Sequence, residues 1–367
     1  MEAHISFTRS ERAARPRGPR ASAALATALA LGAVACRTAV PEAPPPASPP
    51  GAAAREEPRA PEPGRSAAAP LPPGSDVDLS AVRVEVALFE RGDAALRRLR
   101  AAGMPASLPR VGSELALVEL RVRGVADESW VGCRDFRVAG SSRVVYFHAP
   151  RAFVTPELET GVLRAGDTRT GWCAYAIPTT ERDLFLLLSE PGSRDPAGLR
   201  YLALEPGASI ALAPAAASTP MGVTAADPAP LGSEVITGDW SVKALEVLRG
   251  EAASRLVLDA DEQNEPPQEG LEFVAVKLRA RYFGRSGQPG LVSPAEFRAV
   301  SASGEVYPRA IVIDVRPRLS STLLPGGEHT GWGVFQVARG DASPLLRFQP
   351  FYPDEGRRFL ALTPEPR

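Results

Sequence analysis

The sequence predicts an all-β fold with two tandem β-sandwich domains, and three observations lead to that prediction. Apolar residues alternate with polar ones in short runs, as where Val82, Val84 and Val86 alternate with Arg83 and Glu85. Turn-forming Gly, Pro and Asp residues separate these runs, a pattern typical of a sandwich or a barrel. The second half of the chain repeats the first half at a nearly constant spacing.

The composition excludes several classes of protein. The chain has 367 residues and a formal net charge of −1, whereas nucleic-acid-binding proteins normally show a strong basic excess. Apolar residues make up 44% of the chain, which is enough to form packed cores. We therefore expect two or three folded domains and no nucleic-acid partner.

Residues 1–35 have the pattern of a secretory signal peptide. Five arginines lie in the first 20 residues, and residues 21–35 are uncharged and end in small side chains. A basic region followed by a short apolar run and a small-residue cleavage site is typical of such a signal. The uncharged run has 15 residues, whereas a membrane-spanning helix needs about 20. Removal of residues 1–35 leaves a mature chain with a net charge of −4.

Ala33, Val34, Ala35 and Cys36 resemble the lipobox of bacterial lipoproteins. The resemblance implies cleavage before Cys36 and attachment of lipid to its sulfur, which would join the protein to a membrane. Several acyl chains hold a protein stably on a bilayer, whereas a single chain does not. Arg37 rather than Asp follows the cysteine, which in that family favours the outer membrane. Ala33 and Ala35 also fit ordinary signal peptidase, so a soluble secreted product is the alternative.

Residues 36–76 are expected to form a disordered tether between the anchor and the folded domains. Twelve prolines lie between Pro41 and Pro73, among many alanines. Such a stretch cannot build a core and favours an extended polyproline conformation. At about 3.1 Å per residue it would span on the order of 100 Å. A proline-rich docking motif is the alternative.

The two halves of the chain match at an offset of 158–161 residues. The clearest match is Thr170-Gly171-Trp172 with Thr330-Gly331-Trp332. Further matches, in order along the chain, are Arg91–Ala95 with Arg249–Ala253, Gly112–Arg121 with Gly270–Arg279, Asp135–Arg137 with Glu296–Arg298, Val145-Tyr146 with Val306-Tyr307, and Arg200–Leu204 with Arg358–Leu362. A period of this length is a domain. We therefore place domain 1 at residues 77–206 and domain 2 at residues 235–366, with a proline- and alanine-rich linker at residues 207–234.

A turn that leads into a core strand is clearest in domain 2. There Leu323-Leu324-Pro325-Gly326-Gly327-Glu328 precedes Gly331, Phe335 and Val337. This order resembles the telokin-like, immunoglobulin-fold domain of secreted bacterial proteins, a family largely of unknown function. Domain 1 departs from the pattern at Ala165, Thr168 and Tyr175. The resemblance implies an immunoglobulin-like β-sandwich for each domain and a place at the cell surface, and it transfers no catalytic residue.

The chain has three cysteines, one of them in the lipobox. If that one carries lipid, an even pair remains inside domain 1 of an exported protein, which favours a disulfide between Cys133 and Cys173. Two buried thiols are one alternative, and a zinc site that adds His148 is another. The matching positions of domain 2 lie near Pro294 and Gly333, so we expect domain 2 to lack the bridge.

One acidic loop is a weak candidate for a metal site. Asp259, Asp261, Glu262 and Asn264 offer the oxygen ligands that Ca²⁺ prefers. The loop lacks the glycine and the spacing of an EF-hand, and the matching residues 101–111 of domain 1 contain no acid. A solvated loop is therefore favoured, and we expect no resident metal and no cofactor.

The remaining motifs do not indicate catalysis. No Ser–His–Asp or Cys–His set has a supporting motif, and no glycine-rich phosphate loop occurs. Trp172 and Trp332 could line a ligand face, although packing is favoured, and the Arg-Gly-Asp tripeptides at residues 91–93 and 339–341 suit polar turns.

We therefore expect a lipid-anchored envelope protein that is not an enzyme. Its role would be binding or structural, and its partner in the envelope or outside the cell is not identified by the sequence. The alternative is an envelope chaperone or assembly accessory that binds extended polypeptide by strand addition. A hydrolase is a less favoured alternative.

Overall fold

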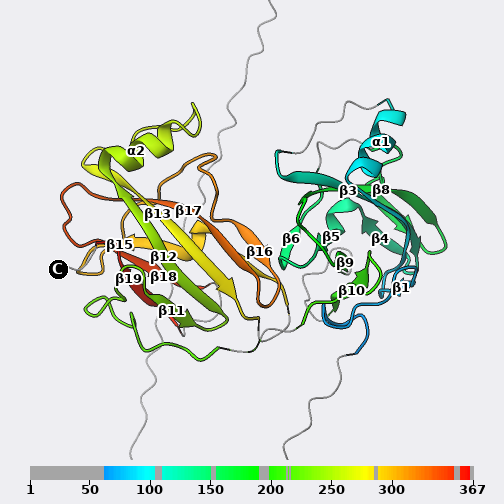
Figure 1. Cartoon of the computed structure of the whole chain (residues 1–367), viewed down its shortest axis with the longest axis horizontal. Helices are drawn as coiled ribbons and strands as arrows, with labels where there is room; N and C mark the ends of the chain where they lie inside the picture. The colour runs from blue at the N-terminus through cyan, green and yellow to red at the C-terminus, as the bar shows by residue number, and fades with distance from the viewer. Residues whose placement is uncertain are drawn as a thin grey trace, which may run out of the picture. The chain divides into compact units, whose positions relative to one another are not determined.

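The computed structural model describes residues 62–103, 110–149, 154–189, 198–211, 214, 216–284, 288–350 and 356–363. The predicted signal peptide, Cys36 and most of the predicted tether lie outside the described residues. The described chain consists mainly of antiparallel strands, so the predicted all-β class is confirmed (Figure 1). None of the helices among the described residues is long and apolar enough to cross a membrane.

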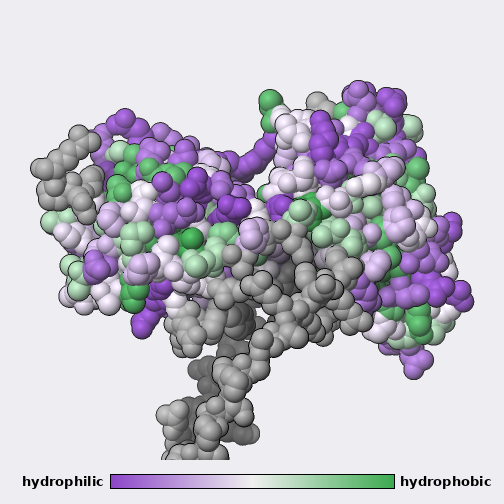
Figure 2. Space-filling model, turned by 60° about the horizontal axis from the view of Figure 1, so that its bottom comes forward, coloured by the Kyte–Doolittle hydropathy of each residue, from purple (hydrophilic) through white to green (hydrophobic). Residues whose placement is uncertain are grey.

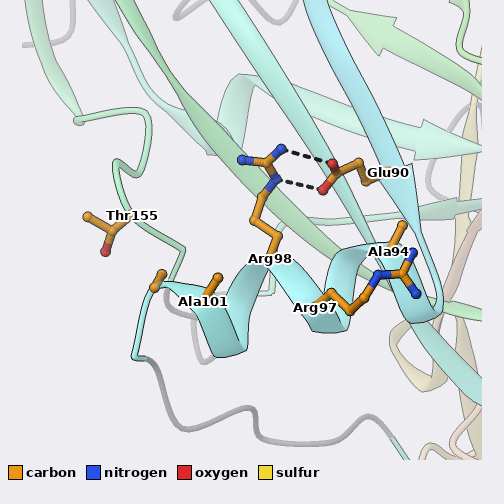
Figure 3. A pocket seen from close by; sticks show the side chains of 7 residues that line it. Glu90, Ala94, Arg97, Arg98, Ala101 and Thr155 are labelled. Atoms are coloured by element: carbon orange, nitrogen blue, oxygen red, sulfur yellow. Dashed lines mark hydrogen bonds and ion pairs between the residues drawn. The ribbon is translucent and has the colours of Figure 1, made fainter.

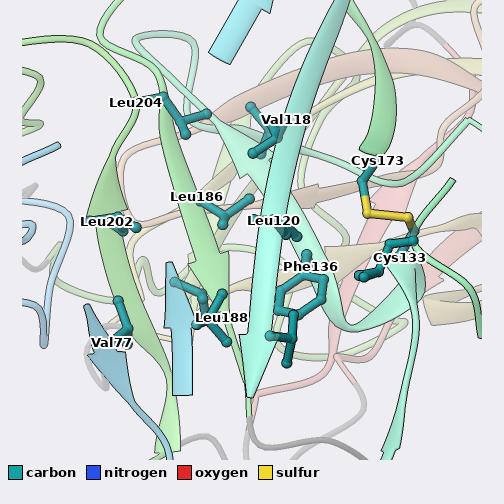
Figure 4. Close-up of a cluster of buried hydrophobic side chains, with 14 of the residues drawn as sticks. Val77, Val118, Leu120, Cys133, Phe136, Cys173, Leu186, Leu188, Leu202 and Leu204 are labelled. Carbon is teal, nitrogen blue, oxygen red and sulfur yellow. A yellow bond between two sulfur atoms is a disulfide. The ribbon is translucent and has the colours of Figure 1, made fainter. Parts of the chain in front are cut away.

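Domain 1 encloses its core between two layers of strands. The first sheet has the order β1 (Val77–Asp78), β2 (Val82–Arg91), β3 (Ser113–Gly124) and β8 (Thr168–Pro178). The second layer contains β10 (Arg200–Ala203), β9 (Phe185–Leu188), β5 (Phe136–Ala139) and β6 (Val144–Tyr146), and β4 (Glu128–Val131) pairs with β7 (Gly161–Arg164). Alternate residues of β3 enter the core, where Val118 and Leu120 lie near Leu186 and Leu188 of β9 (Figure 4).

Domain 2 repeats this plan. Its first sheet has the order β11 (Glu234–Thr237), β12 (Trp240–Arg249), β13 (Leu271–Tyr282) and β17 (Glu328–Ala338). Opposite it lie β15 (Phe297–Val300), β18 (Leu345–Phe348) and β19 (Arg358–Ala361), and β14 (Gly290–Val292) pairs with β16 (Ser321–Leu323). Val274, Val276 and Leu278 of β13 enter the core beside Phe297 and Phe348, whose rings stack with centroids 4.8 Å apart.

Strand pairing also connects the two domains. β6 pairs with β16, with Val144 opposite Leu323 and Val145 opposite Thr322. The second layer of domain 1 therefore continues into the β14–β16 pair of domain 2. The Arg143 guanidinium, next to this pairing, donates hydrogen bonds to backbone oxygens on both sides of it, those of Ala211 and Pro325.

A short helix covers the outer face of the first sheet in each domain. Ala95 and Leu99 of α1 (Asp93–Ala101) pack over Trp172 in a buried cluster, and α2 (Gly250–Leu258) packs in the same way over Trp332 (Figure 1). Trp172 is 2% exposed and Trp332 is 8% exposed. The two tryptophans are therefore packing residues beneath a helix, and this explains why the Thr-Gly-Trp segment is repeated.

The repeated Arg-Gly pair forms the corner between the long strand and this helix. Gly92 has a φ of +58°, a conformation that favours glycine. Arg91 forms an ion pair with Glu114, the acid of the repeated Gly-x-Glu motif, and Arg249 forms the matching pair with Glu272. The first Arg-Gly-Asp tripeptide is thus part of a structural corner in which the arginine is half-buried.

Both domains begin earlier than the boundaries predicted at residues 77 and 235. In the segment predicted as tether, the Leu71 amide donates to the Tyr201 carbonyl of β10 at 2.9 Å. In the segment predicted as linker, the Ala229 amide donates to the Phe359 carbonyl of β19 at 2.8 Å. The composition misled the prediction because an irregular segment rich in Pro and Ala can still bond to a sheet edge through its backbone.

Candidate functional site

The two domains have equivalent sites beside the repeated Thr-Gly-Trp segment. Residues 156–158 are bonded to the backbone of Trp172, and residues 317–319 are bonded to Trp332 in the same pattern, with N···O distances of 2.6 to 3.1 Å. Each segment forms a parallel bridge to its tryptophan. These bonds place Glu157 of domain 1 and Arg318 of domain 2 at the same point of the fold.

The residues at the two equivalent sites differ in chemistry. The sequence repeat aligns the following pairs, with the domain 1 residue first: Cys133 with Pro294, His148 with Arg309, Glu157 with Arg318, and Cys173 with Gly333. Domain 1 therefore has thiol, imidazole and carboxylate groups where domain 2 has two guanidinium groups and two residues without a polar side chain.

In domain 1 the predicted cysteine pair forms a disulfide, which lies at one end of the core (Figure 4). The His148 Nε2 lies 3.2 Å from the Glu157 Oε1. The side chain of His148 is 9% exposed and that of Glu157 is 47% exposed. The Nδ1 atom of His148 is buried and has no hydrogen-bond partner among the described residues. A ligand atom from each of Cys133, His148 and Glu157 lies within 4.8 Å of the others.

In domain 2 the equivalent site is a pocket of about 220 Å³. Its buried wall includes Phe297, Val334 and Phe335, and its polar lining includes Arg309 and Arg318. Where domain 1 has a disulfide, domain 2 has Pro294 and Gly333, which lack the two sulfur atoms. Beside Gly333 the Phe335 ring occupies the position that a side chain would take, and Pro294 lines the pocket.

The electrostatic character of the domain 2 pocket is cationic. Arg309 and Arg318 are exposed, and neither guanidinium has a hydrogen-bond or ion-pair partner in the described part of the chain. Below them, Glu296 is 5% exposed, and burial raises the pKa of its carboxyl, which disfavours the negative charge. Tyr307 donates to the Asp341 Oδ2 at 2.6 Å, and burial together with this bond raises the Tyr307 pKa to about 12.

Ser293 in this pocket has a capping role. Its amide and its hydroxyl donate to the Glu296 Oε2 at 2.7 and 2.8 Å, and its Oγ accepts a bond from the Ala295 amide. The serine and the glutamate thereby cap the short 3₁₀ turn Pro294–Glu296. Sequence reasoning did not identify this site, although the repeat alignment contains the signal that two arginines replace His148 and Glu157.

A second hollow, of about 450 Å³, lies beside α1 (Figure 3). Arg98 crosses it and donates two hydrogen bonds to Glu90, at 2.6 and 2.8 Å, which lower the pKa of that carboxyl. The same guanidinium lies 4.2 Å from the Trp172 ring centroid. Arg98 is thus held by structural contacts, and the hollow offers a ligand mainly the surface of α1 around Arg97 and the side chain of Thr155 from the segment opposite.

In the acidic loop of domain 2, the weak candidate for a Ca²⁺ site, the Asn264 side chain is engaged with the backbone. The Asn264 amide is 8% exposed, and its nitrogen donates to the Val257 and Ile313 carbonyls while its oxygen accepts from the Ile313 amide. Asn264 therefore bridges two segments of backbone. Asp259, Asp261 and Glu262 form no group of three close ligand atoms among the described residues.

Sheet edges in the described chain are short or are bridged at one or two residues. The edge strands β1 and β11 have two and four residues. β8 and β17 are bridged by residues 157 and 318, and β10 and β19 by residues 71 and 229. On the face seen in Figure 2, hydrophobic side chains are scattered among hydrophilic ones.

Comparison with known proteins finds no family model and no curated protein that matches this chain. Solved structures match it in part. The ycdA protein of Bacillus subtilis, described as a candidate lipoprotein, is 10% identical with a TM-score of 0.29 over 36% of this chain and 38% of its own. The secreted protein MPT63 of Mycobacterium tuberculosis is 12% identical with a TM-score of 0.28 over 38% of this chain and 99% of its own. The yjhA protein of Bacillus subtilis is 13% identical with a TM-score of 0.25 over 37% of this chain and 99% of its own.

Proposed function

We propose that this chain is an exported, lipid-anchored envelope protein that binds a small anionic ligand in domain 2 and catalyses no reaction. The observation that carries the proposal is the pocket of about 220 Å³ with an apolar wall and two unpaired arginines. Export and anchoring rest on the sequence, through the secretory pattern of residues 1–35 and the lipobox at Cys36. We assign the anchor to the outer membrane because Arg37 follows the cysteine, and both domains to the telokin-like family because of the turn and core strand at residues 323–337.

The choice of an anionic ligand follows from the pocket lining. A guanidinium group matches the geometry of a carboxylate, sulfonate or phosphate and forms short, charge-assisted hydrogen bonds with it. Arg309 and Arg318 form no hydrogen bond or ion pair through their guanidinium groups within the described chain, although the charge of Arg309 also favours the ionised form of the Glu296 carboxyl. Val334 and Phe335 offer a surface for an apolar group attached to the anion. A few polar groups on an otherwise apolar concave surface are typical of small-molecule sites.

A binding role fits this pocket better than the two alternatives. The Ser293 hydroxyl caps the short turn Pro294–Glu296. The serine of this pocket therefore has a structural role and not that of a catalytic nucleophile. Strand addition requires an open edge of several residues, and the described edges are short or bridged. We therefore place recognition in the pocket of domain 2.

Naphthalene-1-sulfonate serves as a probe of the pocket. We expect it to bind the unlipidated mature chain, and Arg309→Ala combined with Arg318→Ala should weaken binding at least tenfold. A hydrogen bond to a charged group contributes about 1.5 to 3 kcal/mol, and about 1.4 kcal/mol corresponds to a factor of ten in Kd. Isothermal titration calorimetry measures the change.

Two controls accompany the titration. Arg123→Ala removes an exposed arginine of domain 1 and should leave Kd unchanged. The neutral naphthalene-1-sulfonamide should bind the original chain at least tenfold more weakly than the sulfonate. Equal binding of both compounds, or a double variant that binds like the original chain, would disprove the anionic site.

The anchor is tested separately with Cys36→Ser. Because the lipid is expected on this sulfur, the substitution should abolish incorporation of radiolabelled palmitate and release the protein from the membrane fraction. The Cys133→Ser variant is the control and should be labelled like the original protein. Labelling of Cys36→Ser at the original level would refute the anchor.

A further inference from the structure

The cluster around the disulfide of domain 1 brings together four side chains that can bind a transition metal. Cys133 and Cys173 contribute two sulfur atoms, and His148 and Glu157 contribute an imidazole and a carboxylate. Thiolate, imidazole and carboxylate are the ligands that Zn²⁺ uses in proteins. In the oxidised protein both sulfurs are consumed by the disulfide bond. The chemistry of the cluster therefore depends on the state of that bond.

The ligand atoms are already close to the spacing of a tetrahedral site. With Zn–S distances of about 2.3 Å and Zn–N or Zn–O distances of about 2.0 Å, neighbouring ligand atoms lie about 3.3 to 3.8 Å apart. The atoms of Cys133, His148 and Glu157 lie within 4.8 Å of one another, and the His148 Nε2 and Glu157 Oε1 are 3.2 Å apart. The Cys173 sulfur is bonded to that of Cys133 but is not part of this group of three close atoms. Once the bond is reduced, the Cys173 side chain would have to turn toward the group to bind the same ion.

The His148 imidazole is the member of the cluster that most strongly indicates a metal site. Its side chain is 9% exposed, and its buried Nδ1 has no partner among the described residues. Its Nε2 faces the Glu157 carboxylate, so this nitrogen is the one placed to share an ion with Glu157. Glu157 is half-exposed, whereas Cys133 and Cys173 are buried.

We propose that domain 1, once its disulfide is reduced, binds one Zn²⁺ through Cys133, Cys173, His148 and Glu157. A thiol reductant supplies the two electrons: two R–SH molecules become R–S–S–R, and the S–S bond of the protein becomes two S–H groups. Zn²⁺ then displaces both thiol protons, which are released to solvent. The site lies in domain 1 and is independent of the anionic site proposed for domain 2.

Domain 2 provides a built-in comparison. At its equivalent positions it has Pro294, Arg309, Arg318 and Gly333, none of which binds Zn²⁺. The proposal therefore fixes the stoichiometry at one metal ion per chain, in the reduced form only.

Co²⁺ and Zn²⁺ titrations of the mature unlipidated chain test the site. After reduction with tris(2-carboxyethyl)phosphine, which is itself oxidised to the phosphine oxide, Co²⁺ should produce thiolate-to-cobalt charge-transfer absorption that saturates at one equivalent and is removed by Zn²⁺. The oxidised chain should show no such band. Loss of a second-shell group typically costs 10- to 100-fold in metal affinity, so His148→Gln, which removes a ligand, should cost at least about 100-fold.

Glu157→Gln is the variant least able to disturb folding, because its side chain is half-exposed. It should weaken Co²⁺ binding about tenfold or more and keep the thiolate band. Arg318→Gln, at the equivalent position of domain 2, should leave Co²⁺ binding unchanged. The proposal is overturned if the reduced chain shows no thiolate band with Co²⁺, or if His148→Gln and Glu157→Gln both bind Co²⁺ as tightly as the original chain.

Discussion

Gly171→Ala is expected to destabilise domain 1 strongly. Gly171 lies in β8 against the crossing segment of residues 156–158, and an added Cβ would lie 2.5 Å from the N and Cα atoms of Leu158. Those atoms belong to a backbone that is bonded to Trp172 on both sides, so neither partner can move away without breaking hydrogen bonds. Overpacking costs about 1 to 3 kcal/mol and occasionally more, and each lost hydrogen bond costs about 1 kcal/mol.

Urea denaturation followed by circular dichroism measures this loss. We expect the free energy of unfolding to fall by about 3 kcal/mol or more. Gly161→Ala is the matched control in the neighbouring strand β7, because its added Cβ would meet only the Arg169 guanidinium, at 3.8 Å. Its effect should stay within about 0.5 kcal/mol. Equal stability of the two variants would show that the crossing segment does not constrain Gly171.

Gly331→Ala extends the test to domain 2. Its added Cβ would lie 2.5 Å from backbone atoms of Arg318 and Leu319, in the same arrangement as in domain 1. We therefore expect Gly331→Ala to lower the free energy of unfolding as much as Gly171→Ala does. The repeated Thr-Gly-Trp segment thus has a physical basis: glycine allows the crossing segment to approach the strand, and tryptophan packs beneath the helix.

Removal of the disulfide is the second large effect we expect. Cys133 and Cys173 are 40 residues apart in the chain. In the loop-entropy treatment, a bridge that closes such a loop stabilises the folded state by about 4 kcal/mol. Cys133→Ala combined with Cys173→Ala should therefore lower the melting temperature of domain 1 on the order of 15 °C, as measured by differential scanning calorimetry.

Reduction of the original chain in the presence of a metal chelator should lower the melting temperature of domain 1 by a similar amount. The chelator prevents bound metal from replacing the bridge. Domain 2 contains no cysteine, so the reductant should leave its own unfolding unchanged. If the double variant melts at the same temperature as the original chain, the packing of the core, and not the bridge, stabilises this end of domain 1.

Much of the fold could be predicted because its signals are local or repeated. The alternation in β2 and β3 indicated strands with one buried face, and the match of Arg91–Ala95 with Arg249–Ala253 revealed the duplication. The disulfide followed from counting cysteines in an exported chain. Domain starts were placed too late, because the segments that complete β10 and β19 have the composition of a linker while their backbone bonds join them to a sheet.

The candidate sites could be predicted only in part. His148 and the two cysteines were considered together from the sequence, but Glu157 was not, because its position depends on residues 156–158 crossing β8. The arginines of domain 2 are exposed residues in segments without a motif, and nothing local distinguishes Arg309 from other surface arginines. Their common pocket exists because residues 293–299, residues 307–310, Arg318 and β17 meet there.

Residue type and spacing along the chain were enough to predict the strand-rich class, an internal repeat, the cysteine pair and an export pattern. The start of each domain, the packing role of the repeated tryptophans, and the disulfide cluster and cationic pocket at equivalent points could be read only from the folded chain. Those features depend on which segments pack against β8 and β17, and packing between distant segments is set by the whole core rather than by local pattern.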